Sequence, residues 1–170
     1  RSVASRSLTS SLRRVASSVT PEIGAGVFGE RPCEGVPMKG IAPPPLRPGD
    51  RIGVVAPAGP VRREALEAGI AVIERRGFEV VRGRHLYDRQ GYLAGSDADR
   101  RADLQRMIRD PGIAALWFAR GGYGLHRIAG DLDLAPLRRH PKALVGYSDI
   151  TELQAAPWRR FRCGSLPEPM

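Results

Sequence analysis

The sequence predicts an α/β protein in which a doubly wound, mostly parallel sheet carries helices on both faces. Three observations lead to this fold class. Short apolar runs rich in β-branched residues recur between residues 46 and 156, amphipathic segments separate them, and glycine or proline marks many of the boundaries. Strands that alternate with helices form parallel sheets, because each helix carries the chain back across the sheet.

The first strand and the first helix have the clearest patterns. Arg51–Pro57 reads RIGVVAP, an apolar run between Pro-Gly-Asp and Ala-Gly-Pro, and it predicts a buried strand. In Arg62–Arg76, apolar residues at i, i+4 and i+7 give a helix one apolar face; they are Leu66, Ile70 and Ile73. Gly77 is expected to end this helix, and Phe78–Val81 is expected to form the second strand.

The remaining elements continue the alternation. Ser96, with Asp99 three residues later, resembles a capping box and predicts a helix that stops before Pro111. A third strand, a short helix and a fourth strand are then expected at Ala114–Ala119, Leu125–Gly130 and Ala143–Tyr147. A helix is expected from Asp149, and Pro157 is expected to interrupt it because proline lacks the backbone N–H.

Three loops follow strands in this scheme, at Ala58–Val61, Arg120–Gly124 and Ser148–Thr151. If the strands are parallel, all three loops lie at one edge of the sheet, where open α/β sheets bind their ligands. Arg120–Gly124 reads RGGYG, and its glycines allow backbone N–H groups to approach a phosphate, a carboxylate or a developing oxyanion. A plain tight turn would have the same composition, so this motif alone is not specific.

Gly146–Ile150 reads GYSDI at a predicted strand-to-helix junction. A sharp turn there would expose the Ser148 hydroxyl and leave the N–H of Asp149 as an oxyanion donor. The pattern differs from the G-x-S-x-G elbow of α/β-hydrolases, because Ile150 occupies the position of the second glycine. A serine at such a junction can also be a helix N-cap, so position alone leaves both roles open.

The formal net charge of +9 does not indicate a nucleic-acid partner. Residues 48–156 hold 17 basic and 14 acidic groups, a difference of only +3, and most of the excess lies near the two ends. A phosphate-binding surface concentrates its charge on the folded domain. No run approaches the roughly 18 apolar residues of a membrane-spanning helix. The sequence therefore predicts neither a nucleic-acid nor a membrane partner.

The ends of the chain differ in composition from its centre. Residues 1–45 are rich in Ser, Arg, Pro and Gly, and we expect a disordered or non-native leader, although the acid-poor opening also resembles a transit peptide. Residues 46–156 are expected to form one domain, and residues 157–170 an irregular tail. Cys33 and Cys163 match no metal-ligand spacing. They indicate little beyond the fact that the chain is not a disulfide scaffold.

Four motifs give the sequence a family resemblance when they are read together. In chain order they are LRPGD with VVAPAGP, YLAGSD with Arg100 and Asp103, ARGGYG, and GYSDIT, spread over about 110 residues. This series resembles the N-terminal half of the LD-carboxypeptidases. These are serine peptidases that include the muramoyl-tetrapeptide carboxypeptidases and the microcin C self-immunity proteins.

The resemblance implies a flavodoxin-like or class I amidotransferase-like fold in which Ser148 is the nucleophile. It implies that the N–H of Asp149 is one oxyanion donor and that a glycine of the pair Gly121 and Gly122 supplies the other. The Asp149 carboxylate is expected to cap its own helix. An enzyme that removes a C-terminal D-amino acid must bind a free carboxylate, and Arg120 suits that role. A structural ion pair is the alternative role for Arg120.

The implied reaction is hydrolysis of an L,D-peptide bond of a muropeptide substrate in cytoplasmic peptidoglycan recycling. The resemblance implies that the enzyme needs no metal and no cofactor and is a homodimer at full length. The Glu and His that activate the serine in this family belong to a C-terminal domain. We therefore expect this chain to be an N-terminal fragment without activity of its own. Its histidines match none of the family's catalytic positions; they are His85, His126 and His140.

The alternative function is a small-molecule binding module in which Arg120–Gly124 holds a phosphate or a nucleotide. Such a module is expected to carry an acidic, ribose-binding residue about 20 positions after the glycine-rich loop. The stretch Arg138–Leu144 contains no carboxylate and is basic instead. The sequence therefore favours the carboxypeptidase.

Overall fold

A computed structural model describes residues 41–161 and 166–167, all of which belong to one compact unit, Gly40–Met170. The predicted leader up to residue 40, both cysteines and half of the predicted tail (residues 162–165 and 168–170) lie outside the described residues. The strands are β1 (Arg51–Val55), β2 (Glu79–Arg82), β3 (Ile113–Phe118), β4 (Ala143–Gly146) and β5 (Leu166–Pro167). The helices are α2 (Arg63–Arg75), α3 (Asp97–Arg109), α4 (His126–Ala129), α5 (Pro136–Arg139) and α6 (Thr151–Phe161), with a 3-10 turn, η1 (Ser148–Ile150), before α6.

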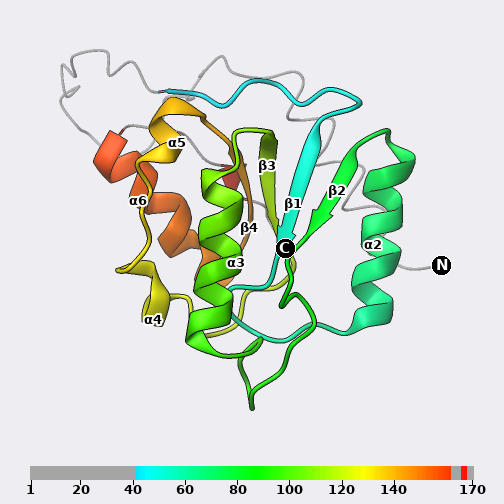
Figure 1. Ribbon diagram of the computed structural model, residues 1–170, viewed down its shortest axis with the longest axis vertical. Helices are drawn as coiled ribbons and strands as arrows, with labels where there is room; N and C mark the ends of the chain where they lie inside the picture. The colour runs from blue at the N-terminus through cyan, green and yellow to red at the C-terminus, as the bar shows by residue number, and fades with distance from the viewer. Residues whose placement is uncertain (1–40, 162–165, 168–170) are drawn as a thin grey trace, which may run out of the picture. The chain divides into compact units, whose positions relative to one another are not determined.

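The five strands form one sheet in the order β2-β1-β3-β4-β5, and every pair of neighbours is parallel (Figure 1). Strand β1 is the second strand of the sheet: β2 lies on one side of it, and β3, β4 and β5 follow on the other side. This arrangement confirms the predicted α/β fold with a doubly wound parallel sheet. Among the described residues, no helix has the length and apolar composition needed to cross a membrane.

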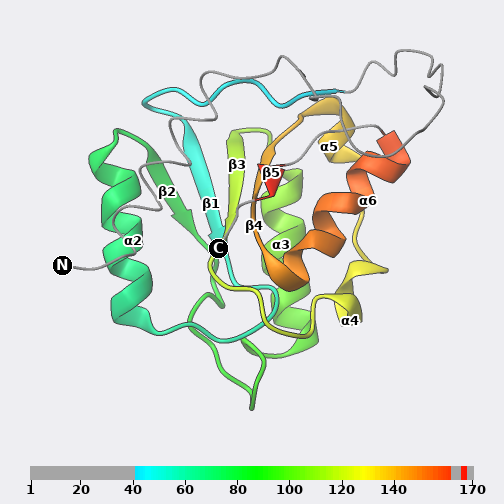
Figure 2. The same cartoon turned by 180° about the vertical axis from the view of Figure 1, so that it is seen from behind.

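Strand β1 packs against a helix on each of its faces, because successive side chains of a strand point to opposite sides. Ile52 belongs to the same buried cluster as Ile73 of α2. Gly53 faces the other way, and a Cβ on it would lie only 3.1 Å from the sulfur of Met107 in α3. The missing side chain of Gly53 therefore lets α3 pack closely on β1. Figure 1 shows α3 in front of the sheet, and Figure 2 shows it behind.

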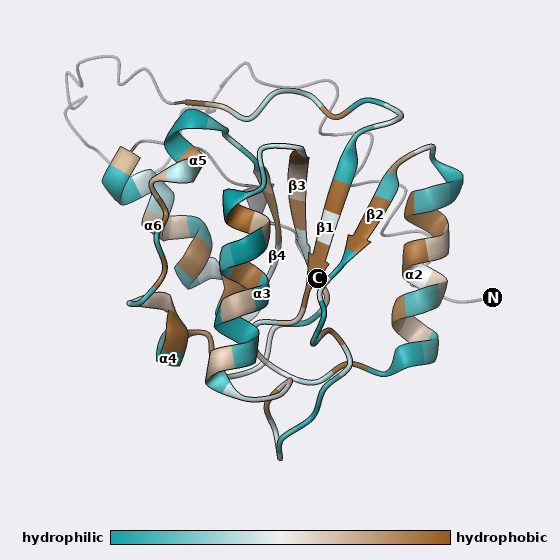
Figure 3. Ribbon diagram, in the orientation of Figure 1, coloured by the Kyte–Doolittle hydropathy of each residue, from teal (hydrophilic) through white to brown (hydrophobic). Residues whose placement is uncertain are grey.

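The larger core lies on the α3 side of the sheet. Leu104 and Met107 of α3 are fully buried there and belong to one cluster with Leu116 and Phe118 of β3 and Leu153 of α6. Figure 3 shows the apolar composition of β1 and β3 and the mixture of polar and apolar residues along α2 and α3. Burial of these amphipathic helices on an apolar sheet is the main force that holds the layers together.

The predicted helix ends are confirmed. Gly77 has a positive φ of 85°, and its N–H donates to the carbonyl of Glu74 in the last turn of α2. The Ser96 hydroxyl accepts a hydrogen bond from the N–H of Asp99 at 3.1 Å and caps α3. Both features give partners to backbone groups that a helix end leaves without an intrahelical bond.

The prediction that Pro157 interrupts the last helix is wrong. Helix α6 contains Pro157 and continues to Phe161. Proline removes one backbone hydrogen bond, but Pro157 and Leu153 are buried, and Phe161 packs against the main core. Tertiary packing of the apolar face therefore sustains the helix despite the missing bond.

Candidate active site

The three loops that follow β1, β3 and β4 meet at the carboxyl edge of the sheet, as predicted from parallel strands. The N–H of Gly59, after β1, donates to the carbonyl of Gly121, after β3, at 3.1 Å. Gly121 also contacts the loop after β4, because a Cβ on it would lie 2.9 Å from the Cβ of Ser148 and 2.8 Å from the carbonyl oxygen of Tyr147. Gly121 therefore contacts both of the other loops.

Ser148 has the most unusual backbone of this edge. Its φ is +61°, and among the described residues no other non-glycine residue has a positive φ. The left-handed region is sterically unfavourable for a side chain, so the turn between β4 and η1 is a strained one. The N-cap of η1 is Tyr147, without a side-chain hydrogen bond, so Ser148 does not act as the N-cap that its position allowed. The side chain of Ser148 is exposed at the sheet edge.

The Asp149 carboxylate does not cap its own helix, which corrects the expectation from the sequence. It accepts a hydrogen bond from the N–H of Leu125 at 2.8 Å. Leu125 is buried just before α4, where backbone N–H groups lack intrahelical acceptors, so the carboxylate satisfies one of them. Asp149 therefore connects the end of the glycine loop to the turn at Ser148 between β4 and η1, which we call the serine turn.

Backbone N–H groups of the serine turn and of the glycine loop donate to no described group, that of Gly121 among them, and are available to a ligand. The N–H of Asp149 lies in the first turn of η1, where no intrahelical acceptor exists, and no other described group accepts it. The N–H of Gly122 likewise donates to no described group, and the φ of Gly122 is +114°. A positive φ at Gly122 turns the backbone in a way that a side chain would oppose.

The Arg120 guanidinium is exposed at the start of the glycine loop. Its Nη1 donates to the carbonyl of Pro60 at 2.9 Å, which ties this side chain to the loop after β1. None of the ion pairs between described residues includes Arg120. The structural ion pair considered as its alternative role is therefore absent from this part of the chain. The guanidinium can bind the anionic group of a ligand.

Arg100 is the residue whose importance the sequence analysis missed. Its side chain is 0% exposed and donates to the carbonyls of Pro57, after β1, and Gly124, in the glycine loop, the latter at 3.1 Å. It also pairs with Asp97, whose carboxyl pKa is lowered by Arg127 and by Arg100. Arg100 therefore joins the loop after β1 to the glycine loop from within the core.

A signal for Arg100 was present in the sequence. The residue precedes Leu104 by four positions and Met107 by seven, so it lies on the apolar stripe of α3. An arginine on such a stripe has to find buried acceptors, because a buried charge without partners is very unfavourable. The sequence could have identified Arg100 as a buried structural cation, although not its partners.

The histidines lie elsewhere on the described part of the chain. His85 follows β2 and contacts Asp88, whereas the ring of His126 packs edge-on against Tyr123 with centroids 4.6 Å apart. Among the described residues, no histidine forms a hydrogen bond with Ser148. The described residues therefore bring no histidine to Ser148 as a general base.

Comparison with known proteins places these features in a family. The family model described as LD-carboxypeptidase N-terminal domain matches residues 52–166. A putative carboxypeptidase of Streptomyces coelicolor is 46% identical over 134 residues, which are 76% of this chain and 43% of that protein. A probable murein peptide carboxypeptidase of Bacillus subtilis is 43% identical over 124 residues, covering 70% of this chain and 39% of that protein.

The fold agrees with that of a solved relative. The structure of muramoyltetrapeptide carboxypeptidase from Oxalobacter formigenes matches with a TM-score of 0.62 at 30% identity, over 71% of this chain and 40% of that one. The chain thus spans about two-fifths of the length of these relatives. Because the family model matches more than half of its residues, the chain belongs to the LD-carboxypeptidase family.

Proposed function

We propose that this chain is the nucleophile-bearing half of a serine carboxypeptidase that hydrolyses an L,D-peptide bond of murein peptides. The observation that carries the proposal is the strained turn at Ser148, with φ +61°, packed directly against Gly121 of the glycine loop. Membership in the family supports a carboxypeptidase activity, and the relative from Bacillus subtilis is named for murein peptides. The role of Ser148 rests on this geometry and on the motif.

In the proposed reaction, the Ser148 hydroxyl attacks the carbonyl carbon of the scissile bond, and the carbonyl oxygen becomes an oxyanion. The free N–H of Asp149 would donate to this oxygen, together with an N–H of the pair Gly121 and Gly122. A preorganised donor of this kind contributes about 3 kcal/mol to transition-state stabilisation. The serine ester formed is then hydrolysed by water after the terminal amino acid has left.

The attack needs a base, because a serine hydroxyl is a poor nucleophile near neutral pH. The family resemblance assigns this role to a Glu and a His of the other half of the enzyme, and the described residues bring no histidine to Ser148. We therefore propose that the 170-residue chain releases no D-amino acid unaided. The cytoplasmic location and the homodimer of the complete enzyme are parts of the same proposal and rest on the resemblance alone.

Arg120 would select the substrate by its free C-terminal carboxylate. The guanidinium has five N–H donors in a planar fork that matches a carboxylate, and in the described region only the Pro60 carbonyl uses one of them. Because Arg120 immediately precedes Gly121, a carboxylate held there would bring the last peptide bond of a substrate next to Ser148.

A chimera tests the proposal. Residues 46–161 of this chain would replace the corresponding half of the Bacillus subtilis relative, and D-alanine release from a muramoyl tetrapeptide would be measured. We expect the chimera to be active and Ser148→Ala to lower kcat by at least about three orders of magnitude. Thr151→Ala removes a nearby exposed hydroxyl at the start of α6 and is the matched control, expected to retain activity. Retention of turnover by a folded Ser148→Ala chimera, checked by circular dichroism, would refute the assignment.

A further inference from the structure

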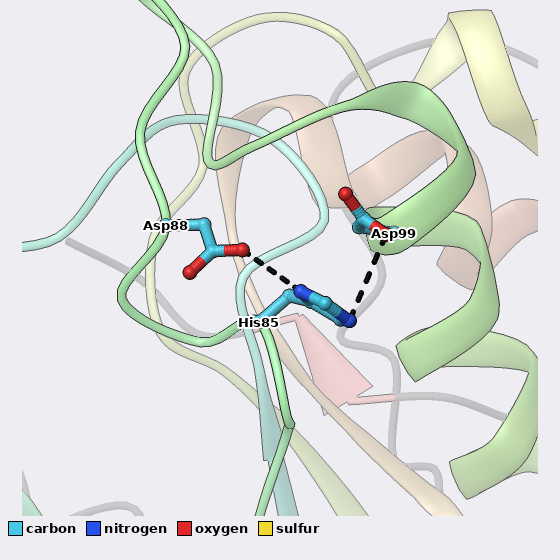
Figure 4. Close-up of side chains that lie close together, drawn as sticks. All are labelled: His85, Asp88 and Asp99. Carbon is cyan, nitrogen blue, oxygen red and sulfur yellow. Dashed lines mark hydrogen bonds and ion pairs between the residues drawn. The ribbon is translucent and has the colours of Figure 1, made fainter.

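A cluster of titratable side chains lies beyond the carboxyl end of β2, away from Ser148 in the sheet order (Figure 4). The imidazole of His85 sits between two carboxylates: Nδ1 is 2.8 Å from Oδ2 of Asp88, and Nε2 is 3.7 Å from Oδ1 of Asp99. His85 and Asp88 belong to the loop after β2, whereas Asp99 lies in the first turn of α3. One potential ligand atom from each residue lies within 4.8 Å of the other two.

We propose that His85 Nε2 and Asp99 Oδ1 bind a divalent transition-metal ion, with Zn²⁺ as the best match, and that Asp88 orients the imidazole. Zinc binds imidazole nitrogen and carboxylate oxygen at about 2.0–2.2 Å, so two such ligands of a tetrahedral ion lie about 3.4 Å apart. The observed separation of 3.7 Å needs only a small side-chain rotation to meet this value. Water would complete the coordination, since all three side chains are between about a third and a half exposed.

The contacts around the two ligand atoms resemble the outer shell of a metal site. A metal-binding histidine commonly donates its other ring N–H to a carboxylate, which fixes the tautomer and makes the ligand nitrogen more basic. Asp88 stands in that position at Nδ1. The Oδ2 atom of Asp99 accepts a hydrogen bond from the Ser96 hydroxyl at 2.6 Å, which leaves Oδ1 facing the imidazole.

The backbone of His85 is also held in place. Its N–H donates to Oδ2 of the buried Asp103 at 2.7 Å, and the N–H of Arg84 donates to the other oxygen of the same carboxylate at 3.0 Å. The loop after β2 is thus fixed to α3 independently of the imidazole. Neither ligand atom takes part in these supporting bonds, so an ion can bind without breaking them.

Protons compete with the metal for this site. Asp88, by its hydrogen bond, and the charges of Asp99 and Asp103 raise the pKa of His85. A metal binds only the neutral imidazole, so binding should release a proton and tighten as the pH rises above the ordinary histidine pKa of about 6.5. The same three carboxylates attract a divalent cation.

Calorimetric titration with Zn²⁺ tests the site in the whole chain, with Cys33 and Cys163 replaced by serine because thiolates bind zinc strongly. We expect one ion per chain and loss of this binding in His85→Ala and in Asp99→Asn. Asp88→Asn should weaken binding about 10- to 100-fold, the usual effect of removing a carboxylate behind a metal-binding histidine. His126→Ala removes a histidine of α4 that does not belong to this cluster; it is the matched control and should bind normally.

Imidazole nitrogen resonances identify the ligand atom directly. Zn²⁺ should shift Nε2 of His85 and leave its Nδ1 protonated, which a plain ion pair with Asp99 would not produce. Absence of zinc binding, or equal binding by the parent and the folded His85→Ala variant, would overturn the proposal. The test requires no catalytic activity, so its outcome is independent of the proposed carboxypeptidase function.

Discussion

Gly121→Ala is the substitution that tests most directly whether the glycine loop and the serine turn are packed together. The added methyl group would lie 2.8 Å from the carbonyl oxygen of Tyr147 and 2.9 Å from the Cβ of Ser148. Nonbonded carbon atoms are most stable at about 3.5–4.0 Å, so one of the two loops must move by several tenths of an ångström. The φ of Gly121 is not positive, and the cost therefore comes from overlap rather than from backbone conformation.

The expected change in stability follows from two opposing effects. Overpacking of a well-packed site costs about 1–3 kcal/mol. Alanine also restricts the unfolded chain, which stabilises the folded state by about 0.4–1 kcal/mol. With central values of about 2 and about 0.7 kcal/mol, the free energy of unfolding should fall by about 1.3 kcal/mol.

Urea unfolding of the 170-residue chain, followed by circular dichroism, measures this difference. Gly69→Ala is the matched control, because Gly69 lies inside α2 and a Cβ on it meets nothing within 4 Å. Alanine is favoured over glycine in a helix interior, so this control should gain about 0.5–1 kcal/mol. If Gly121→Ala stabilised the chain as much as Gly69→Ala does, the two loops would not be in contact and the proposed site would lose its geometry.

Three further predictions concern the surroundings of the site. Arg100→Met leaves the buried Pro57 carbonyl without a donor and removes one of two donors to the Gly124 carbonyl, so urea unfolding should show a loss of about 1–3 kcal/mol. Arg127→Met, at an exposed ion pair, should cost less than about 1 kcal/mol. In the chimera, Gly122→Val should lower kcat about a hundredfold with little change in KM; a raised KM at unchanged kcat would instead indicate a ligand cradle. The pKa of His85 is raised above 6.5, so its contribution to stability is complete below that pH and is lost as the pH rises through the folded-state pKa. Unfolding free energies should therefore decline over that window more steeply than those of His85→Gln, and coincident pH profiles would contradict the ion pairs of Figure 4.

The sequence predicted the larger elements because their boundaries are chemically marked. The apolar run at β1 lies between glycine and proline residues, and Ser96 and Gly77 cap helices whose apolar residues recur with a helical period. The elements that it missed, α5 and β5, have only four and two residues. Such short segments show no periodicity, and their conformation depends on the elements against which they lie.

The site was predictable in its location but not in its supporting contacts. Parallel strands bring their following loops to one edge, so the meeting of the three loops follows from topology alone. The contact of Arg100 with Pro57 spans 43 residues, and that of Asp149 with Leu125 spans 24. No local pattern encodes such pairs, because each depends on how α3 and η1 are placed by the whole core.

The backbone of Ser148 connects the stability of this edge with its chemistry. A left-handed conformation costs a non-glycine residue about 1–2 kcal/mol, and glycine would adopt it without that cost but would provide no hydroxyl. Strain of this kind persists only where the surroundings over-determine it. At this turn, the missing side chain of Gly121 leaves room for Ser148. The hydrogen bond from the Leu125 N–H to the Asp149 carboxylate holds the residue that follows Ser148. The close contact that makes Gly121→Ala unfavourable is therefore also one of the contacts that keep the serine hydroxyl at the edge of the sheet.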